Sequence, residues 1–200
     1  SAASDVYKRQ FIYYYIMPIQ TPICDFGQKA HDFKLKSTDN KILSLEDIKG
    51  ENGTLIMFIC NHCPYVKAVT KDIAEDTKKL KDLGINTVAI CANDAENYPE
   101  DSFENMIEFA KKNQFLFPYL VDETQEIART YDAVCTPDFF GYNKNLELQY
   151  RGRLRELKNL VPVRDGDSDL FNAMKQIAET GKGPENQTPS AGCSIKWKNS

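Results

Sequence analysis

The sequence lacks the features that define several broad classes of protein. No apolar run approaches the roughly 20 residues that cross a bilayer, and the longest, residues 11–19, includes three tyrosines. Positive charge is not in excess, because the net charge is −4, and this argues against a nucleic-acid-binding protein or a basic protein of the membrane surface. The chain also contains no Gly-rich phosphate loop, no Ser-His-Asp order and no recognisable pair of catalytic carboxylates.

Cysteine is scarce too, with six in 200 residues, which is too few for a disulfide scaffold. A chain of this length buries roughly 70% of its unfolded surface, so its core needs neither disulfides nor a structural metal. The hydrophobic fraction of 42% and the charged fraction of 27% are typical of a soluble globular domain. We therefore expect one domain, residues 17–180, with an extension at each end.

The two ends differ from the rest of the chain. Residues 1–16 have the outline of a signal peptide but no Leu/Ala-rich core and no small-x-small cleavage site, so a non-native or disordered leader is expected. Without a credible signal the expected compartment is the cytoplasm, with export as the alternative. Residues 181–200 hold three Gly and two Pro, which predicts a coil. This tail also contains Cys193 and the only tryptophan, Trp197, which indicates that it packs on the domain.

Between the ends, apolar periodicity predicts strands that alternate with helices. The expected order is a β-hairpin (31–43), a helical turn capped by Ser44 (44–48), a buried strand (54–59), a helix (65–83), a strand (85–91), a helix (102–112), a strand (117–121), a helix capped by Thr124 (124–131), a second hairpin (138–142 and 147–153) and a last helix (169–180). This order predicts a three-layer α/β/α sandwich whose core is a parallel sheet with antiparallel edge strands.

The chemistry is expected at Cys60-Asn61-His62-Cys63, between the first buried strand and the longest helix. Cys60 should lie at the helix N-terminus, where unpaired N–H groups and the helix dipole stabilise a thiolate. A protonated His62 would add positive charge, and Cys63 should be the less exposed, resolving thiol. The alternatives are a zinc half-site or inert buried cysteines. Zinc needs four ligands, and the sequence has no second CxxC or HxxxH, with His31 the only other histidine.

Three stretches resemble the motifs of a known family. They are residues 58–67 (Phe-Ile-Cys-Asn-His-Cys-Pro-Tyr-Val-Lys), residues 135–139 (Cys-Thr-Pro-Asp-Phe) and residues 189–198 (Pro-Ser-Ala-Gly-Cys-Ser-Ile-Lys-Trp-Lys). Over roughly residues 26–198 the chain resembles the thioredoxin-fold redoxins, which include the alkyl hydroperoxide reductase and thiol-specific antioxidant relatives. The resemblance implies a thioredoxin-like fold with a docked C-terminal tail. It also implies a cis bond before Pro137, where Thr136 and Pro137 receive the extended chain of a partner.

The chain also departs from this family. Ile59 stands where thioredoxins usually carry Trp, and the strand before it contains no acid. The proton acceptor for Cys63 is therefore open, with three candidates in the segment before and within the next helix: Glu96, Glu100 and Glu104. Met57 stands where the peroxidases of the superfamily carry Thr, which weakens a direct peroxidase role.

The remaining cysteines are possible additional redox thiols. Cys193 could pair with Cys135 or Cys60, and Cys135 could instead be a small buried filler. Cys24 and Cys91 are weaker candidates, with Cys91 expected in the core. Three arginines that alternate along the second hairpin are expected on a solvated face: Arg151, Arg153 and Arg155.

The sequence therefore predicts a thiol–disulfide oxidoreductase with a role in antioxidant defence and cell redox homeostasis. Cys60 would attack, Cys63 would resolve the mixed disulfide, and Thr136 with Pro137 would seat the substrate. The expected partners are protein or small-molecule thiols and disulfides and a second dithiol system, with no organic cofactor, metal, nucleic acid or membrane. His62 should raise the reduction potential and give an oxidising or isomerising bias. The alternatives are a thiol-dependent peroxidase, and a non-catalytic protein that binds a metal or a partner at the cysteines.

Overall fold

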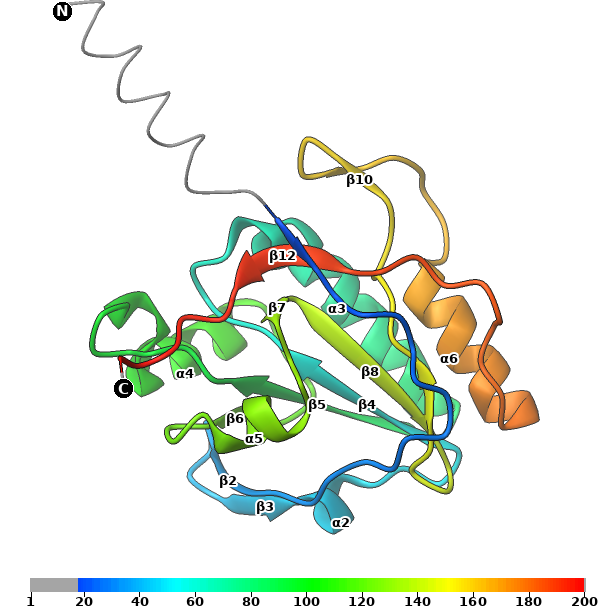
Figure 1. Cartoon of the computed structure of the whole chain (residues 1–200), viewed down its shortest axis with the longest axis horizontal. Helices are drawn as coiled ribbons and strands as arrows, with labels where there is room; N and C mark the ends of the chain where they lie inside the picture. The colour runs from blue at the N-terminus through cyan, green and yellow to red at the C-terminus, as the bar shows by residue number, and fades with distance from the viewer. Residues whose placement is uncertain (1–17, 200) are drawn as a thin grey trace, which may run out of the picture.

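The computed structural model describes residues 18–199 and is built on a seven-stranded mixed sheet (Figure 1). From edge to edge, the strands are β3 (Ile42–Ser44), β2 (Lys34–Ser37), β6 (Tyr119–Val121), β5 (Ile85–Cys91), β4 (Gly53–Phe58), β8 (Asp138–Asn143) and β9 (Leu148–Tyr150). The three central strands β6, β5 and β4 are parallel, and the remaining neighbours are antiparallel. The leader expected at residues 1–16 lies outside the described residues.

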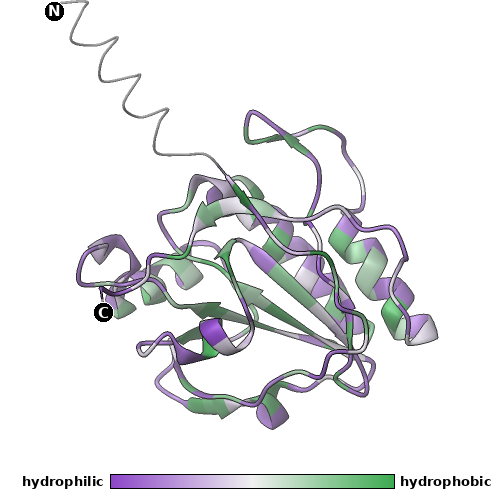
Figure 2. Ribbon diagram, in the orientation of Figure 1, coloured by the Kyte–Doolittle hydropathy of each residue, from purple (hydrophilic) through white to green (hydrophobic). Residues whose placement is uncertain are grey.

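Helices cover both faces of this sheet, so the three-layer prediction is confirmed. Leu55 and Met57 of β4 pack in one core with α3 (Pro64–Asp82) and α6 (Asp169–Thr180). Ile56 and Phe58 pack in a second core with α2 (Leu45–Ile48) and α5 (Glu126–Thr130). Because successive strand residues point to opposite faces, every residue of β4 is buried. Figure 2 shows the apolar strands enclosed between helices whose outer faces are polar.

Most helix ends follow their local sequence. Ser102 caps α4 (Phe103–Lys112) and Ser168 caps α6, each accepting a backbone N–H three residues on. The expected Thr124 cap is wrong. The N-cap of α5 is Gln125, whose backbone lies in the left-handed region at φ +63°. The side-chain Nε2 of Gln125 donates to the carbonyl of Ala92 at 2.6 Å, and this hydrogen bond holds the residue in place.

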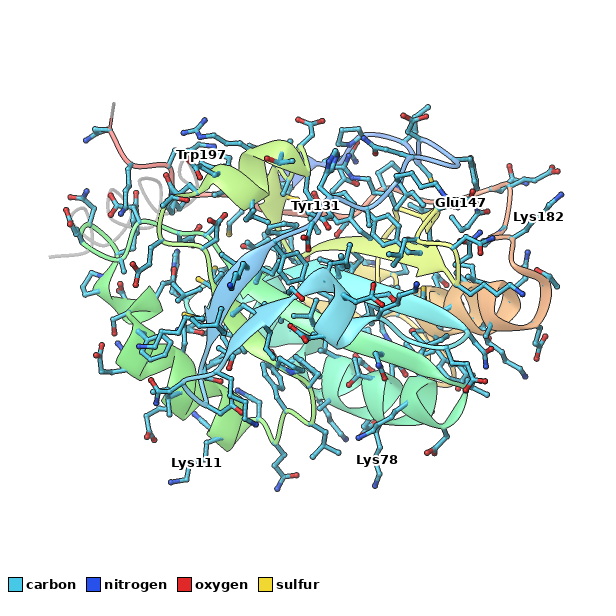
Figure 3. The ribbon with its side chains drawn as sticks, turned by 90° about the horizontal axis from the view of Figure 1, so that it is seen from below. Lys78, Lys111, Tyr131, Glu147, Lys182 and Trp197 are labelled. Carbon is cyan, nitrogen blue, oxygen red and sulfur yellow. The ribbon has the colours of Figure 1, made fainter. Side chains whose placement is uncertain are left out.

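The C-terminal tail is not a coil throughout. Residues Ala191–Ser194 form β12, which lies between β1 (Ile19–Gln20) and β7 (Cys135–Thr136) in a second, three-stranded sheet (Figure 1). Pairing on both sides satisfies the backbone of a Gly-containing segment that has little tendency to form a strand alone. Beyond β12, Trp197 packs against α5, with the Arg129 guanidinium 4.3 Å from its ring (Figure 3). Within residues 18–199, no helix is long and apolar enough to cross a membrane.

The prediction of a solvated face for the three arginines is wrong. Arg151 is only 5% exposed and its Nη2 lies 3.0 Å from Oδ2 of Asp138. Arg155 also turns inward, to Asp72 at 2.9 Å. The reason is that β9 ends at Tyr150, so the alternation expected to residue 153 does not apply. A short hairpin of β10 (Leu157–Lys158) and β11 (Val161–Pro162) follows.

Candidate active site

The two cysteines of the motif lie where β4 gives way to α3. Both are buried, Cys60 at 1% and Cys63 at 0% exposure, so exposure does not separate an attacking from a resolving thiol as expected. The Sγ of Cys60 lies 3.3 Å from Oγ1 of Thr136, and the thiol of Cys63 donates to the Thr136 carbonyl at 3.1 Å. Thr136 therefore contacts both sulfurs from the opposite side of the site.

The electrostatic order of the two thiols is also the reverse of the one expected. The helix begins at Pro64, so its N-cap is Cys63 and not Cys60. Hydrogen bonds from the thiols of Cys193 and Cys60, with help from the Val66 N–H, hold the pKa of Cys63 well below its usual range. The hydrogen bond with Cys63, burial and the negative charge of Asp101 raise the pKa of Cys60. The two shifts favour loss of the first proton from Cys63 rather than from Cys60.

His62 is held beside the pair by a buried carboxylate. Its Nδ1 lies 2.6 Å from Oδ2 of Asp101, whose side chain has no exposed surface. The Asp101 hydrogen bond raises the pKa of His62. The histidine ring also stacks on Tyr98, with centroids 5.6 Å apart and ring planes 9° from parallel. His62 is therefore fixed next to the dithiol, where the raised pKa favours its protonated form.

Asp101 organises the whole loop around the cysteines. It accepts the backbone N–H groups of Asn61 at 2.7 Å and His62 at 3.3 Å, and the side-chain amide of Asn93 at 2.8 Å. Burial raises the pKa of Asp101, but the hydrogen bonds from His62 and Asn93 outweigh this and the net direction is downward. Tyr119 donates to the Asn61 side chain at 3.0 Å and secures the other side of the loop.

Sequence reasoning missed Asp101. Its three carboxylate candidates, Glu96, Glu100 and Glu104, are all exposed. Asp101 ends a 3-10 turn, η1 (Pro99–Asp101), in which Asp101 is buried and the neighbouring acid Glu100 is exposed. A signal was available in Ser102, which caps α4 and so fixes where the turn must end, but the direction of the Asp101 side chain needed the tertiary structure.

The Thr136–Pro137 peptide bond is cis, as the resemblance implies. Asp138, the next residue, forms the buried ion pair with Arg151, which also donates to the Asp132 carbonyl at 2.7 Å. Burial raises the pKa of Asp138 to about 6 despite this partner. Ser190 of the tail donates to the Pro137 carbonyl at 2.7 Å. The loop that faces the cysteines is thus held from the core by Arg151 and from the surface by the tail.

The tail also brings a third thiol to the site. In the β7–β12 pair, Cys193 lies opposite Thr136, whose carbonyl accepts from the Cys63 thiol, and the interaction with Cys63 raises the pKa of Cys193. The sequence had offered Cys60 or Cys135 as its partner, so the structure brings Cys193 to the active-site pair but to its other member. Cys135 is buried, and burial raises the pKa of its thiol; burial likewise raises the pKa of Cys91, to about 12. Cys24 lies away from the motif, near Arg151 and Gln187.

One set of side chains has the composition of a metal site. In the described part of the chain, one ligand atom from each of Cys60, His62 and Asp101 lies within 4.8 Å of the others. These atoms already have partners: His62 and Asp101 are hydrogen-bonded to each other, and the Cys60 sulfur contacts Thr136. Three donors are one fewer than a closed zinc site requires.

A buried dithiol at the end of a central strand, next to a cis-proline loop, defines a thiol-based redox protein of the thioredoxin-like class. The model of the AhpC/TSA family matches residues 26–156, and the chain belongs to that family. Among curated relatives, Peroxiredoxin Bcp of Bacillus subtilis (strain 168) is 22% identical over 161 residues, 78% of this chain and 98% of that protein. Thiol-disulfide oxidoreductase ResA of Bacillus thuringiensis subsp. konkukian is 24% identical over 121 residues, 60% of this chain and 65% of that protein.

Solved structures agree on the fold. An uncharacterized conserved protein from Geobacillus kaustophilus is 42% identical, with a TM-score of 0.87 over 92% of this chain and 98% of its own. A hypothetical protein from Sinorhizobium meliloti 1021 is 32% identical, with a TM-score of 0.84 over 90% and 99%. The thioredoxin domain of a thiol-disulfide oxidoreductase from Bacteroides vulgatus, at 17% identity, gives 0.59 over 76% and 97%. The predicted thioredoxin-like fold is confirmed.

Proposed function

We propose that this protein is a thiol–disulfide oxidoreductase that works through Cys60 and Cys63. The observation that carries the proposal is the contact of both sulfurs with Thr136, at 3.3 Å and 3.1 Å, across from the cis-proline. In this position two thiols can exchange with a disulfide that approaches the Pro137 side. The relationship to ResA supports exchange as the reaction class.

The reaction proceeds by two displacements. Cys60 attacks a substrate disulfide while its proton passes to a Cys63 thiolate, the form that the lowered pKa of Cys63 favours. A mixed disulfide forms at Cys60 and one substrate thiolate leaves. Cys63 then attacks the Cys60 sulfur, its proton goes to the departing thiolate, and the protein is left with a Cys60–Cys63 disulfide. The substrate has gained two electrons, and an external dithiol returns them to the protein.

The surroundings favour small or extended thiol substrates. A groove of about 220 Å³ lies next to Pro137 and is lined in part by Tyr65, Leu154, Leu157 and Pro189. A mostly apolar groove beside the reacting pair suits the flanks of a cysteine in a partner. In this proposal the role is antioxidant and homeostatic, and the compartment is the cytoplasm, where a CxxC pair is more often catalytic than structural.

The test is a redox titration of wild type, Cys60→Ser and Cys63→Ser against glutathione, read by alkylation and intact mass. With Cys193 also replaced by Ser in all three proteins, the proposal expects one reversible two-electron couple that is lost in both cysteine variants. A midpoint above about −230 mV would fit the oxidising bias given by His62. No couple, or a couple that survives in Cys60→Ser, would overturn the proposal.

A second candidate, peroxide reduction, is favoured by the match that spans 98% of Peroxiredoxin Bcp. It predicts that a variant retaining Cys60 but lacking its possible resolving thiols, Cys63, Cys135 and Cys193, consumes one equivalent of hydroperoxide. Dithiol exchange alone predicts no consumption in that variant. Stoichiometric zinc in freshly purified reduced protein would instead favour a binding role at Cys60, His62 and Asp101.

A further inference from the structure

The tail strand covers the backbone edge that faces the active site. β12 pairs antiparallel with β7, in a register that sets Cys193 opposite Thr136 and Ser194 opposite Cys135. Gly192 makes this approach possible, because a Cβ at that position would overlap the Thr136 carbonyl. The chain thus places its own extended, cysteine-bearing segment against the loop that contacts both active-site sulfurs.

Three cysteines gather around Thr136 as a result. Cys60 contacts its hydroxyl at 3.3 Å, Cys63 donates to its carbonyl at 3.1 Å, and Cys193 lies opposite it in the β7–β12 pair. Cys193 is partly exposed, whereas Cys60 and Cys63 are buried. Cys193 packs against the same apolar core as Cys63, so its position is fixed by both the strand pairing and the packing.

We propose that Cys63 alternates between two disulfides, one with Cys60 and one with Cys193. The inference rests on the proposed function, which supplies the Cys60–Cys63 disulfide. The Cys193 sulfur attacks Cys63, the Cys60–Cys63 bond breaks, the Cys63–Cys193 bond forms, and the proton of Cys193 passes to Cys60. No electrons are gained or lost, so the step needs no oxidant.

The exchange has a structural consequence. A Cys63–Cys193 disulfide links β12 covalently to the N-terminus of α3 and fixes the tail over the Cys135–Thr136 edge. Cys60 is then a free thiol although the protein still stores two oxidising equivalents. An extended peptide that pairs with this edge competes with β12, whereas a small disulfide such as oxidised glutathione does not. The second disulfide therefore selects small-molecule substrates over extended ones.

The test follows two tryptic peptides in Cys60→Ser, with Cys60→Ala as a second background. Residues 50–67 then carry Cys63 alone, and residues 183–196 carry Cys193 alone. After treatment with oxidised glutathione, we expect a transient glutathione adduct on Cys63, followed by linkage of the two peptides. The adduct should decay at least tenfold faster than in Cys60→Ser/Cys193→Ser. Cys60→Ser/Cys24→Ser is the matched control, since Cys24 is also partly exposed, and it should behave like Cys60→Ser.

Three outcomes are contrary to the proposal, and they distinguish its failure from failure of the proposed function. If the Cys63 adduct persists in Cys60→Ser while wild type forms the Cys60–Cys63 disulfide, the second disulfide is excluded and the oxidoreductase stands. If wild type forms neither disulfide, the proposed function fails as well. In oxidised wild type quenched in acid and alkylated after unfolding, an alkylated Cys193 with no alkylated Cys60 would also overturn the exchange.

Discussion

The Nδ1 atom of His62 lies 2.6 Å from Oδ2 of Asp101, in a hydrogen bond between a residue of the CxxC loop and the end of a turn 39 positions further along the chain. The pair ties the cysteine loop to the segment before α4 and sets the charge beside the dithiol. Asp101 raises the pKa of His62, and a protonated His62 in turn offsets the negative charge that raises the pKa of Cys60.

The pair should make stability depend on pH. The raised pKa of His62 gives stability that is full below 6.5 and is lost as pH rises through the folded value. The lowered pKa of Asp101 gives stability that is full above 3.8 and is lost as pH falls through its folded value. His62→Gln should therefore cost about 1.5–3 kcal/mol at pH 5.5 and only about 0.5–1.5 kcal/mol near pH 9.

Urea unfolding at the two pH values measures this difference. His31→Gln, which removes the only other histidine, is the control for general effects of histidine titration. An equal loss of stability at both pH values in His62→Gln would show that the ion pair has no part in it.

His62 should also raise the reduction potential. In His62→Gln the Asp101 carboxylate faces the sulfurs without its cation, which disfavours the thiolate and hence the reduced form. We expect the midpoint to fall by about 20 to 40 mV, the equivalent of about 1–2 kcal/mol. Asp101→Asn removes the negative charge and most of the imidazolium together, so its shift should be smaller. Glutathione titration of both variants measures the two midpoint potentials. A larger shift of the midpoint in Asp101→Asn than in His62→Gln would contradict this account.

The buried ion pair behind the cis-proline loop should be costly to break. Arg151→Met leaves Asp138 unpaired in the core, and we expect a loss of about 3–5 kcal/mol at neutral pH. Burial already raises the pKa of Asp138 to about 6, so its ionisation opposes folding as pH rises from 3.8 through that value. The loss should therefore be greater at pH 8 than at pH 5.

Urea midpoints at the two pH values test this expectation. Arg153→Met breaks a more exposed pair, with Asp169 at 2.7 Å, and should cost no more than about 1 kcal/mol. Equal effects of the two substitutions would mean that Asp138 is not left charged in the core.

Docking of the tail should depend on the size of residue 192. Gly192→Ala places a methyl group against the Thr136 carbonyl, so β12 must move or detach from β7. We expect a cost of about 1–3 kcal/mol and at least tenfold faster alkylation of Cys193. Fluorescence of Trp197, the only tryptophan, should shift as the ring leaves Arg129. Ser194→Ala, on the same strand, is the control and should change neither reading.

Local sequence was sufficient for most of the fold because helices and strands repeat their apolar residues with different periods. The run 54–59 predicted β4, and the spacing in 65–83 predicted α3, each to within one residue at either end. The same patterns placed the Cys60–Cys63 pair and the Thr136–Pro137 loop at one end of the sheet. The choice of hydrogen-bond and ion-pair partners by polar side chains follows no such period in the sequence. For that reason Thr124 was taken for the cap of α5 and the second hairpin was extended to residue 153.

What the sequence determined by itself is the layered fold, the position of the dithiol after a buried strand, and the redoxin class of its chemistry. Only the tertiary structure showed that Asp101 is the carboxylate facing His62 and that Arg151 is buried against Asp138. It also showed that Cys193 lies beside the active-site cysteines. The physical reason is that these contacts join side chains from segments far apart in the chain. Their energies depend on burial and on distances of about 3 Å, which the folded backbone sets and no local pattern records.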